Sequence, residues 1–280
     1  MNLCNGFSLM DYARQRGYVL PAFNTTNLEM TIAIAKGLDA AGIPGYIQIS
    51  SNNLRLSSPR VIAEIARFIL KSCRTPIGLH LDHGKSFEHV QACVEAGFTS
   101  VMIDTSSLPY EANVREVARV VQYCHRHDVP VEAELGTLPG KEDDLVSGDQ
   151  KTDPAIVPAF VRDSGCDTLA VSVGNIHGLD APPQIDLPLL RQIAAVCPVP
   201  LVLHGGSGIP GDVIAEAKQC GLIKINYGAA IRKEFISTFG RAYESDHNEH
   251  DVIHLSLAAV RNIAETVKAI ALGINRPQRG

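Results

Sequence analysis

The stretch Pro200–Gly208, PLVLHGGSG, shows the pattern that decides the fold: a short apolar run, a polar residue where the run stops, and a glycine-rich turn. A helix-like segment follows it. Seven other apolar, β-branched runs alternate with helix-like segments along the chain. They are Tyr18–Asn24, Gly45–Ser51, Pro76–His83, Ser100–Ser106, Pro130–Gly136, Thr168–Gly178 and Leu222–Gly228. Eight nearly continuous apolar strands alternating with helices predict a parallel sheet buried on both faces, closed as a (β/α)8 TIM barrel.

The chain of 280 residues is predicted to be a single α/β domain, 1–280. This length suits one barrel, and no linker, low-complexity segment or composition break divides it. An open doubly wound sheet is the alternative, but it would use fewer strands and usually a GxGxxG turn, which is missing. The segment 251–273, DVIHLSLAAVRNIAETVKAIALG, is expected to form a C-terminal closing helix.

Composition excludes several classes of function. The net charge of −5 and the lack of a basic patch argue against nucleic acid as a partner. The apolar runs are too short to cross a membrane, and no secretory signal is recognised, so no membrane partner is expected. Seven scattered cysteines without a C-x-x-C spacing indicate free thiols and a cytoplasmic location.

Polar residues interrupt the apolar runs near the point where each run ends. They are Asn24, Ser50, Asp82, His83, Asp104, Glu134, His177, His204 and Asn226. In a parallel barrel these ends form one rim, and barrel enzymes work at that rim. Because buried polar groups cost free energy unless they are satisfied, packing alone explains this set poorly. We therefore expect a functional site there.

Three histidines belong to this rim: His83, His177 and His204. Three imidazoles that leave a fourth position open suit a catalytic zinc ion. A lone histidine is more often structural, but three on one rim favour a metal. A second group, HNEHDVIH at 247–254, has partly helical spacing, but its charged setting indicates an exposed surface.

The HGGSG turn at 204–208 is a candidate phosphate site, because glycines let backbone N–H groups approach an anion at a helix N-terminus. Its alternative is a tight turn without a ligand. Glu132 and Glu134 share one face of a strand. Paired carboxylates also suit a glycosidase, but the rim histidines and the absence of Trp disfavour that interpretation. Lys224 could form a Schiff base, although an interior ion pair is favoured.

Taken together, the motifs resemble the zinc-dependent class II aldolases of fructose- and tagatose-bisphosphate, and the tagatose-type branch is closer. The resemblance spans nearly the whole chain. The matching motifs are AFN (22–24), HLDHG (80–84), SVMID (100–104), VEAELG (131–136), GKEDD (140–144), GNIHG (174–178), LVLHGGSG (201–208) and KIN (224–226). As an ordered set these motifs are highly specific, whereas any one of them alone is weak.

The resemblance implies a role for each matching position. It implies zinc ligation by His83, His177 and His204, and acid/base catalysis by Asp82 at the aldehyde oxygen. It implies that Glu142 removes the carbon-bound proton of the ketone. A second divalent or monovalent cation, or an alternate zinc position, would use Asp104 and Glu134. The implied substrate contacts are Asn24, Ser50, Gly178, Gly205, Gly206, Ser207 and Asn226.

One position departs from the family pattern. Ala229 stands where the family usually has a threonine that helps to bind phosphate, and Arg232 is the candidate replacement. The expected reaction is reversible cleavage of a ketose 1-phosphate or 1,6-bisphosphate into dihydroxyacetone phosphate and an aldehyde. An aldolase for an unusual or less phosphorylated sugar and a zinc hydrolase on the same barrel are the alternatives. A sugar phosphate is the expected partner, and a homodimer or homotetramer the expected assembly.

Overall fold

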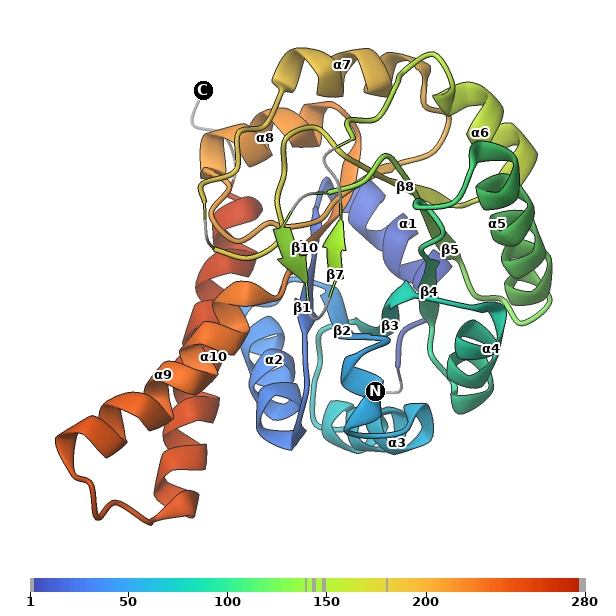
Figure 1. The fold of residues 1–280 in the computed structure, drawn as a ribbon. Coiled ribbons are helices and arrows are strands. Elements are labelled where there is room, and N and C mark those ends of the chain that lie inside the picture. Colours follow the sequence, from blue (N-terminus) through green and yellow to red (C-terminus); the bar gives the residue numbers. More distant parts are fainter. Residues whose placement is uncertain (1–2, 139, 143–144, 148–149, 180, 277–280) are drawn as a thin grey trace.

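A computed structural model describes residues 3–138, 140–142, 145–147, 150–179 and 181–276. Its centre is a closed barrel of eight parallel strands in the order β1-β10-β9-β8-β5-β4-β3-β2 (Figure 1). The strands are β1 (Leu20–Asn24), β2 (Gly45–Ser50), β3 (Ile77–Gly84), β4 (Ser100–Ile103), β5 (Val131–Leu135), β8 (Thr168–Val171), β9 (Leu201–Leu203) and β10 (Leu222–Tyr227). The predicted (β/α)8 barrel is confirmed.

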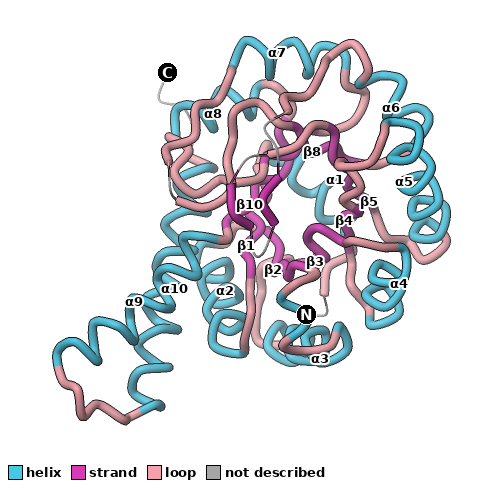
Figure 2. Tube along the Cα trace, viewed as in Figure 1, coloured by secondary structure: helices cyan, strands magenta, loops and turns pink. Residues whose placement is uncertain are grey.

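Helices surround the strands (Figure 2). They are α1 (Gly6–Arg16), α2 (Leu28–Ala41), α3 (Pro59–Leu70), α4 (Phe87–Ala96), α5 (Tyr110–His125), α6 (Val157–Ser164), α7 (Leu187–Val196), α8 (Gly211–Gln219), α9 (Ala229–Ser245), α10 (Val252–Ile274) and the short 3-10 helix η1 (Asn53–Arg55). Residues typical of helix caps mark several of their ends. The Ser58 and Ser86 side chains accept N-cap hydrogen bonds, and Gly42 and Gly97 adopt left-handed C-cap conformations.

The interior of the barrel is apolar at one end and polar at the other. Helix α1, which the sequence analysis did not predict, covers the amino-terminal end of the strands. Its Leu9, Met10 and Ala13 are buried in a cluster with side chains that point inward from the strands. Those side chains belong to Leu20, Ala22, Tyr46, Ala170, Val202 and Ile223. The polar interior groups lie above this cluster and extend from Ser100, at the start of β4, to the carboxyl end of the strands, where barrel enzymes have their sites.

Several predicted runs extend beyond the strands. Strand β8 stops at Val171 and β9 at Leu203, so His177 and the HGGSG turn lie in loops. The backbone leaves the sheet there through glycines with positive φ, which other residues rarely adopt. A further difference is an antiparallel hairpin, β6 (Gly140–Glu142) with β7 (Leu145–Ser147), in the connection after β5.

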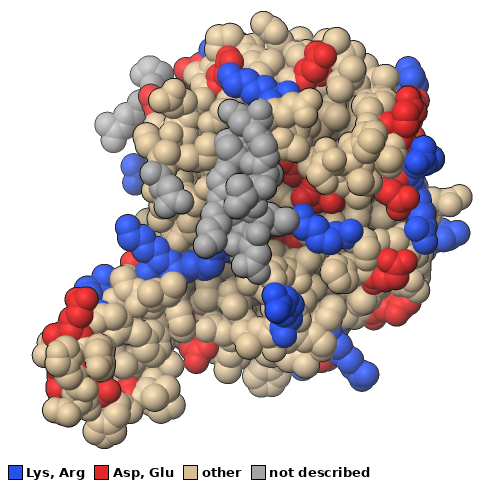
Figure 3. Space-filling view, viewed as in Figure 1, with Lys and Arg blue, Asp and Glu red and all other residues tan. Residues whose placement is uncertain are grey.

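Helix α10 confirms the predicted closing helix. It packs on α2, and with α9 it forms a hairpin that extends away from the barrel (Figure 1). The Asn275 side chain, just after α10, bonds both backbone groups of Val19, at 2.8 Å and 3.0 Å, and so ties the end of the fold to its beginning. No helix in the described ranges has the length and apolar character needed to span a membrane. Basic and acidic side chains are interspersed on the face seen in Figure 3.

We predict that Gly37→Ala destabilises the fold. An added Cβ would lie 2.6 Å from the Ala264 carbonyl oxygen and from the Val267 Cβ, where α2 and α10 are closest. Such overpacking costs about 1–3 kcal/mol. Gly240 of α9 is the matched control, because a Cβ there meets nothing within 4 Å. Gly240→Ala should stabilise by about 0.5–1 kcal/mol. Urea unfolding measures both, and equal effects would contradict the close packing of these helices.

Candidate active site

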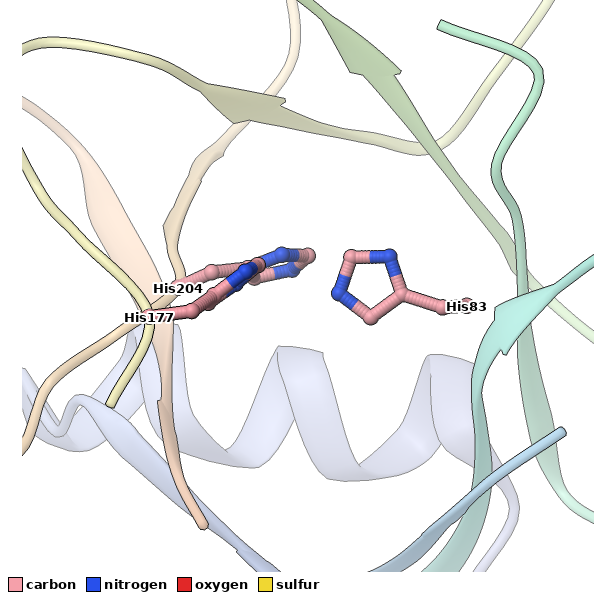
Figure 4. A group of neighbouring side chains, drawn as sticks. All are labelled: His83, His177 and His204. Atoms are coloured by element: carbon pink, nitrogen blue, oxygen red, sulfur yellow. The ribbon is translucent and has the colours of Figure 1, made fainter. Parts of the chain in front are cut away.

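Three imidazoles converge at the carboxyl end of the barrel (Figure 4). His83 is on β3, His204 directly follows β9, and His177 is in the loop after β8. One nitrogen from each ring lies within 4.8 Å of the other two. The sequence therefore predicted correctly which histidines meet, although they come from three separate segments. Three neutral imidazoles in this arrangement can bind one metal ion and leave a position for substrate.

Two of the rings are fixed by carboxylates on their outer side. His204 Nε2 lies 2.8 Å from Glu132 Oε1, and His83 Nδ1 lies 3.0 Å from Asp104 Oδ2. Because an ionised carboxylate only accepts hydrogen bonds, each of these nitrogens carries the proton. The buried Nδ1 of His204 has no hydrogen-bond partner among the described residues. Its lone pair is thus available, and this pattern fits metal ligands oriented by outer carboxylates.

Electrostatics keep His204 in the form that a metal needs. Burial lowers the pKa of His204 below its ordinary value, which favours the neutral ring. Burial alone would raise the pKa of Glu132, but the Lys224 ammonium and the hydrogen bond with His204 hold that pKa far below its ordinary value. Glu132 is therefore a charged acceptor for His204 in neutral solution.

The backbone is strained at His83. Its φ is +46°, a left-handed conformation that is uncommon for residues other than glycine. The Ser51 hydroxyl donates a hydrogen bond of 2.7 Å to the His83 carbonyl oxygen and helps to hold this turn. Strain of this kind persists where the surrounding structure compensates for it, often at functional sites. Here it turns the imidazole toward the other two rings.

Asp82 is fully buried beside this cluster and is held by three amide groups. Its Oδ2 accepts hydrogen bonds from Asn24 Nδ2 at 2.8 Å and Gln48 Nε2 at 3.3 Å, and its Oδ1 from Asn226 Nδ2 at 3.0 Å. Oδ1 also lies 3.9 Å from His83 Nε2. The amides fix the carboxylate next to the ring nitrogen that faces the metal position. Gln48 was missed in the sequence analysis, although a glutamine in the strand GYIQIS was a visible signal.

The predicted interior ion pair of Lys224 is confirmed. Lys224 Nζ lies 2.9 Å from Glu132 Oε2 and donates a 2.6 Å hydrogen bond to Asn226 Oδ1. This bond fixes the amide of Asn226 so that its NH2 group faces Asp82. The lysine therefore connects the carboxylate behind His204 with the carboxylate of Asp82. His80, also missed, lies below this network, where its Nδ1 is 2.9 Å from Ser100 Oγ.

Asp104 and Glu134, predicted as ligands of a second metal, also lie beside His83. Asp104 Oδ2 accepts from Lys85 Nζ at 2.8 Å as well as from His83. Burial would raise the pKa of Asp104, but the hydrogen bonds from His83 and Lys85 and the positive charge of Lys85 hold it well below its ordinary value. Glu134 Oε2 is 3.8 Å from His83 Nδ1 and 3.9 Å from His204 Nδ1.

A small pocket beside the histidines contains most of the predicted phosphate-binding residues. Its lining comprises His177, Gly178, Gly205, Ser207, Asn226, Gly228, Ala229 and Arg232. Gly205 has φ +64°, and a Cβ there would be 2.0 Å from the Ile176 carbonyl oxygen, so only glycine fits. A Cβ on Gly228 would be 3.1 Å from a guanidinium nitrogen of Arg232, which places this cation close to the pocket.

Other predicted contacts lie outside this pocket. Gly206 packs against Ile225 of β10, the Asn24 amide is bonded to Asp82, and Ser50 Oγ accepts a hydrogen bond from the Asn53 backbone. Glu142 ends β6, and its side chain lies outside the described part of the chain.

The second histidine group does not assemble in the described residues. His247 Nδ1 and His250 Nδ1 are each 2.8 Å from a nearby backbone carbonyl oxygen, and His254 starts α10. The only groups of metal-binding side chains within the described ranges are the two at the barrel rim.

A closed barrel with converging imidazoles, a buried aspartate and an adjacent glycine-rich pocket defines a metal-binding barrel enzyme. Comparisons with known proteins identify the family. The model of class II fructose-bisphosphate aldolases matches residues 5–274. The chain belongs to this family and is an aldolase, a carbon–carbon lyase.

Individual relatives agree with this assignment. A fructose-bisphosphate aldolase of Staphylococcus epidermidis is 36% identical over 261 residues, which cover 91% of each chain. The YdjI aldolase of Escherichia coli K12 is 27% identical, with a TM-score of 0.80 over 96% of this chain and 95% of that one. A fructose-bisphosphate aldolase of Campylobacter jejuni is 20% identical, with a TM-score of 0.84 over 98% and 96%, and supports the fold alone.

We predict that Lys224→Met destabilises the metal-free protein by about 3–5 kcal/mol, because it leaves the Glu132 charge buried without its partner. Adding Glu132→Gln should recover much of this loss, since the amide oxygen can still accept from His204 while the charge is gone. Urea unfolding measures both variants. If the double variant is no more stable than Lys224→Met, lost packing and not the unpaired charge explains the effect.

Proposed function

We propose that this chain is a zinc-dependent aldolase that reversibly cleaves a ketose 1-phosphate or 1,6-bisphosphate of the fructose or tagatose type. The products would be dihydroxyacetone phosphate and an aldehyde. The observation that carries the proposal is the set of three imidazoles, two with their outer nitrogen held by a carboxylate, beside the buried Asp82. Membership of the class II family and the name of the Staphylococcus relative support the type of substrate.

The three imidazoles would hold the zinc ion, which when bound supplies a Lewis acid that polarises the ketone carbonyl. Asp82 accepts the hydroxyl proton when the carbon–carbon bond breaks, and returns it in the direction of synthesis. Asn24, Gln48 and Asn226 hold this carboxylate in position, so that little reorganisation is needed during the reaction.

The second proton transfer occurs at carbon. The resemblance assigns it to Glu142, which would protonate the carbon of dihydroxyacetone phosphate after cleavage and remove this proton during synthesis. The hairpin that carries Glu142 follows β5, whose carboxyl end belongs to the same rim as the histidines. The glycine turn and Arg232 hold the phosphate group at the other side of the site.

The state of the cysteine thiols gives an indication of the cellular compartment of this protein. All seven cysteines are free, and those at 73, 93, 124 and 166 are buried. Free buried thiols suit a reducing compartment, and we propose a cytoplasmic enzyme on this ground. The assembly as a homodimer or homotetramer stays a prediction.

We predict that removal of zinc abolishes cleavage and that added zinc restores it. The assay is product formation across fructose and tagatose phosphates, with and without a chelator, which also identifies the preferred sugar. His177→Ala should behave like the chelated protein. Borohydride added with substrate should trap no adduct on Lys224, since this side chain is occupied by Glu132 and Asn226. Covalent trapping together with full activity in chelator would contradict the proposal.

We predict that Arg232 contributes to phosphate affinity in place of the threonine missing at Ala229. A hydrogen bond to a charged group is worth about 1.5–3 kcal/mol, or roughly ten- to hundred-fold in affinity. Arg232→Ala should raise the KM for the phosphorylated substrate by this factor, with a much smaller effect on an unphosphorylated analogue. Adding Ala229→Thr should recover part of the loss. If neither change alters KM for the phosphorylated substrate, this pocket does not bind the phosphate.

A further inference from the structure

The second candidate metal group consists of His83, Asp104 and Glu134. Within this group, the hydrogen bonds of the Asp104 carboxylate are the most completely defined. Its Oδ2 accepts from His83 Nδ1 at 3.0 Å and from Lys85 Nζ at 2.8 Å. Its Oδ1 accepts from the Ser106 hydroxyl at 2.7 Å and from the Ser106 backbone N–H at 3.3 Å. A carboxylate offers about four lone-pair sites. All four are used by donors from this chain.

The backbone holds the lysine in this position. Lys85 follows β3 by one residue, and the Asp104 N–H donates a 2.9 Å hydrogen bond to the Gly84 carbonyl oxygen. This bond places the two residues side by side at the rim. Lys85 is about one-third exposed while Asp104 is largely buried, with exposed side-chain fractions of 35% and 14%. The charged end of the lysine therefore reaches from the surface into the site.

A second cation does not fit these residues. It would have to displace either the ammonium of Lys85 or the N–H of His83 from Asp104 Oδ2. Losing the His83 bond would release the imidazole from its orientation toward the other two rings. Keeping the Lys85 bond would put two positive charges on one carboxylate oxygen, and their repulsion is large at short distance in a poorly solvated site.

We propose that the Lys85 ammonium takes the place of a second cation, so that each chain binds one divalent metal ion at the three histidines. Asp104 is then a positioning residue for His83 and no metal ligand, and Lys85 balances its charge. This proposal rests on one part of the proposed function, which is that the three histidines bind a metal ion. It differs from the expectation of the sequence analysis, which assigned Asp104 and Glu134 to a second cation or an alternate zinc position.

The test is a count of metal sites. The full-length protein is first loaded with one equivalent of zinc and then titrated with Mn²⁺, which prefers oxygen ligands. Unbound Mn²⁺ is measured by electron paramagnetic resonance. Wild type should bind no Mn²⁺ up to millimolar concentration. Lys85→Met should gain one Mn²⁺ site per chain, with a dissociation constant at least about ten-fold below the highest concentration at which wild type binds none, since a nearby positive charge is removed.

Control variants separate this result from nonspecific binding. Lys151→Met removes a lysine from a similar surface pair, 2.9 Å from Asp186, and should gain no site. Lys85→Arg keeps the positive charge and should bind one metal, like wild type. Adding Asp104→Asn to Lys85→Met should remove the new site, which shows that the carboxylate forms it.

Two results would overturn the proposal: a second metal equivalent bound by wild type in this range, or no gain of a site in Lys85→Met. These outcomes are distinct from failure of the proposed function, because the metal count requires no turnover. A protein that binds one zinc ion but cleaves no ketose phosphate would leave this proposal intact. An active aldolase with two bound metals would contradict only the role of Lys85.

Discussion

The buried ion pair between Lys224 and Glu132 is the interaction on which the site depends. Two charges inside a barrel are costly, and their attraction alone rarely repays the loss of hydration. In this barrel each partner makes a further bond: Glu132 accepts from His204, and Lys224 donates to Asn226. The pair therefore fixes both an imidazole and the amide that holds Asp82. The histidine cluster and the buried aspartate therefore share one support.

The ion pair lies between an apolar part and a polar part of the barrel interior. The cluster beneath α1 is apolar. A small cavity lined by Met10, Leu20, Tyr46 and Ile223 on one side and by Glu132 and Lys224 on the other separates this cluster from the ion pair. Above it, most of the buried polar groups bond to another side chain of the barrel wall. Asn24 is bonded to Gln48, both are bonded to Asp82, and His80 is bonded to Ser100. These bonds favour one arrangement of the side chains. Among the described residues, Gln48 Oε1, His80 Nε2 and His204 Nδ1 are buried without a hydrogen-bond partner.

The sequence was sufficient to predict the barrel, its closing helix and the three histidines, because parallel strands bring their carboxyl ends to one rim. It was not sufficient to predict which inward-facing groups pair. Gln48 and His80 share a register with Asn24 across β1, β2 and β3, and this register is defined only by the pairing of the strands in the folded sheet. Helix α1 was missed because its apolar residues are few. The resemblance assigned Asp104 to a second cation or an alternate zinc position. The family motif gives no information on Lys85, whose ammonium lies beside Asp104 in the structure.

The residues proposed to carry out the reaction and the residues proposed to bind the phosphate lie partly on different elements of the barrel. Of the residues proposed to bind the metal and move the hydroxyl proton, Asp82 and His83 are on β3 and His204 directly follows β9, whereas His177 is in the loop after β8. Most of the residues proposed to bind phosphate are in the loop after β9 and at the start of α9, where Ala229 lines the pocket and Arg232 is one turn further. His177 and Asn226 also line this pocket, and Asn226 donates to Asp82, so we expect only substitutions at positions such as 229 and 232 to alter the pocket without disturbing Asp82 or the histidines. The alanine at 229 is therefore compatible with unchanged aldol chemistry on a different phosphorylated sugar, because position 229 itself is neither one of the three histidines nor a residue that bonds Asp82.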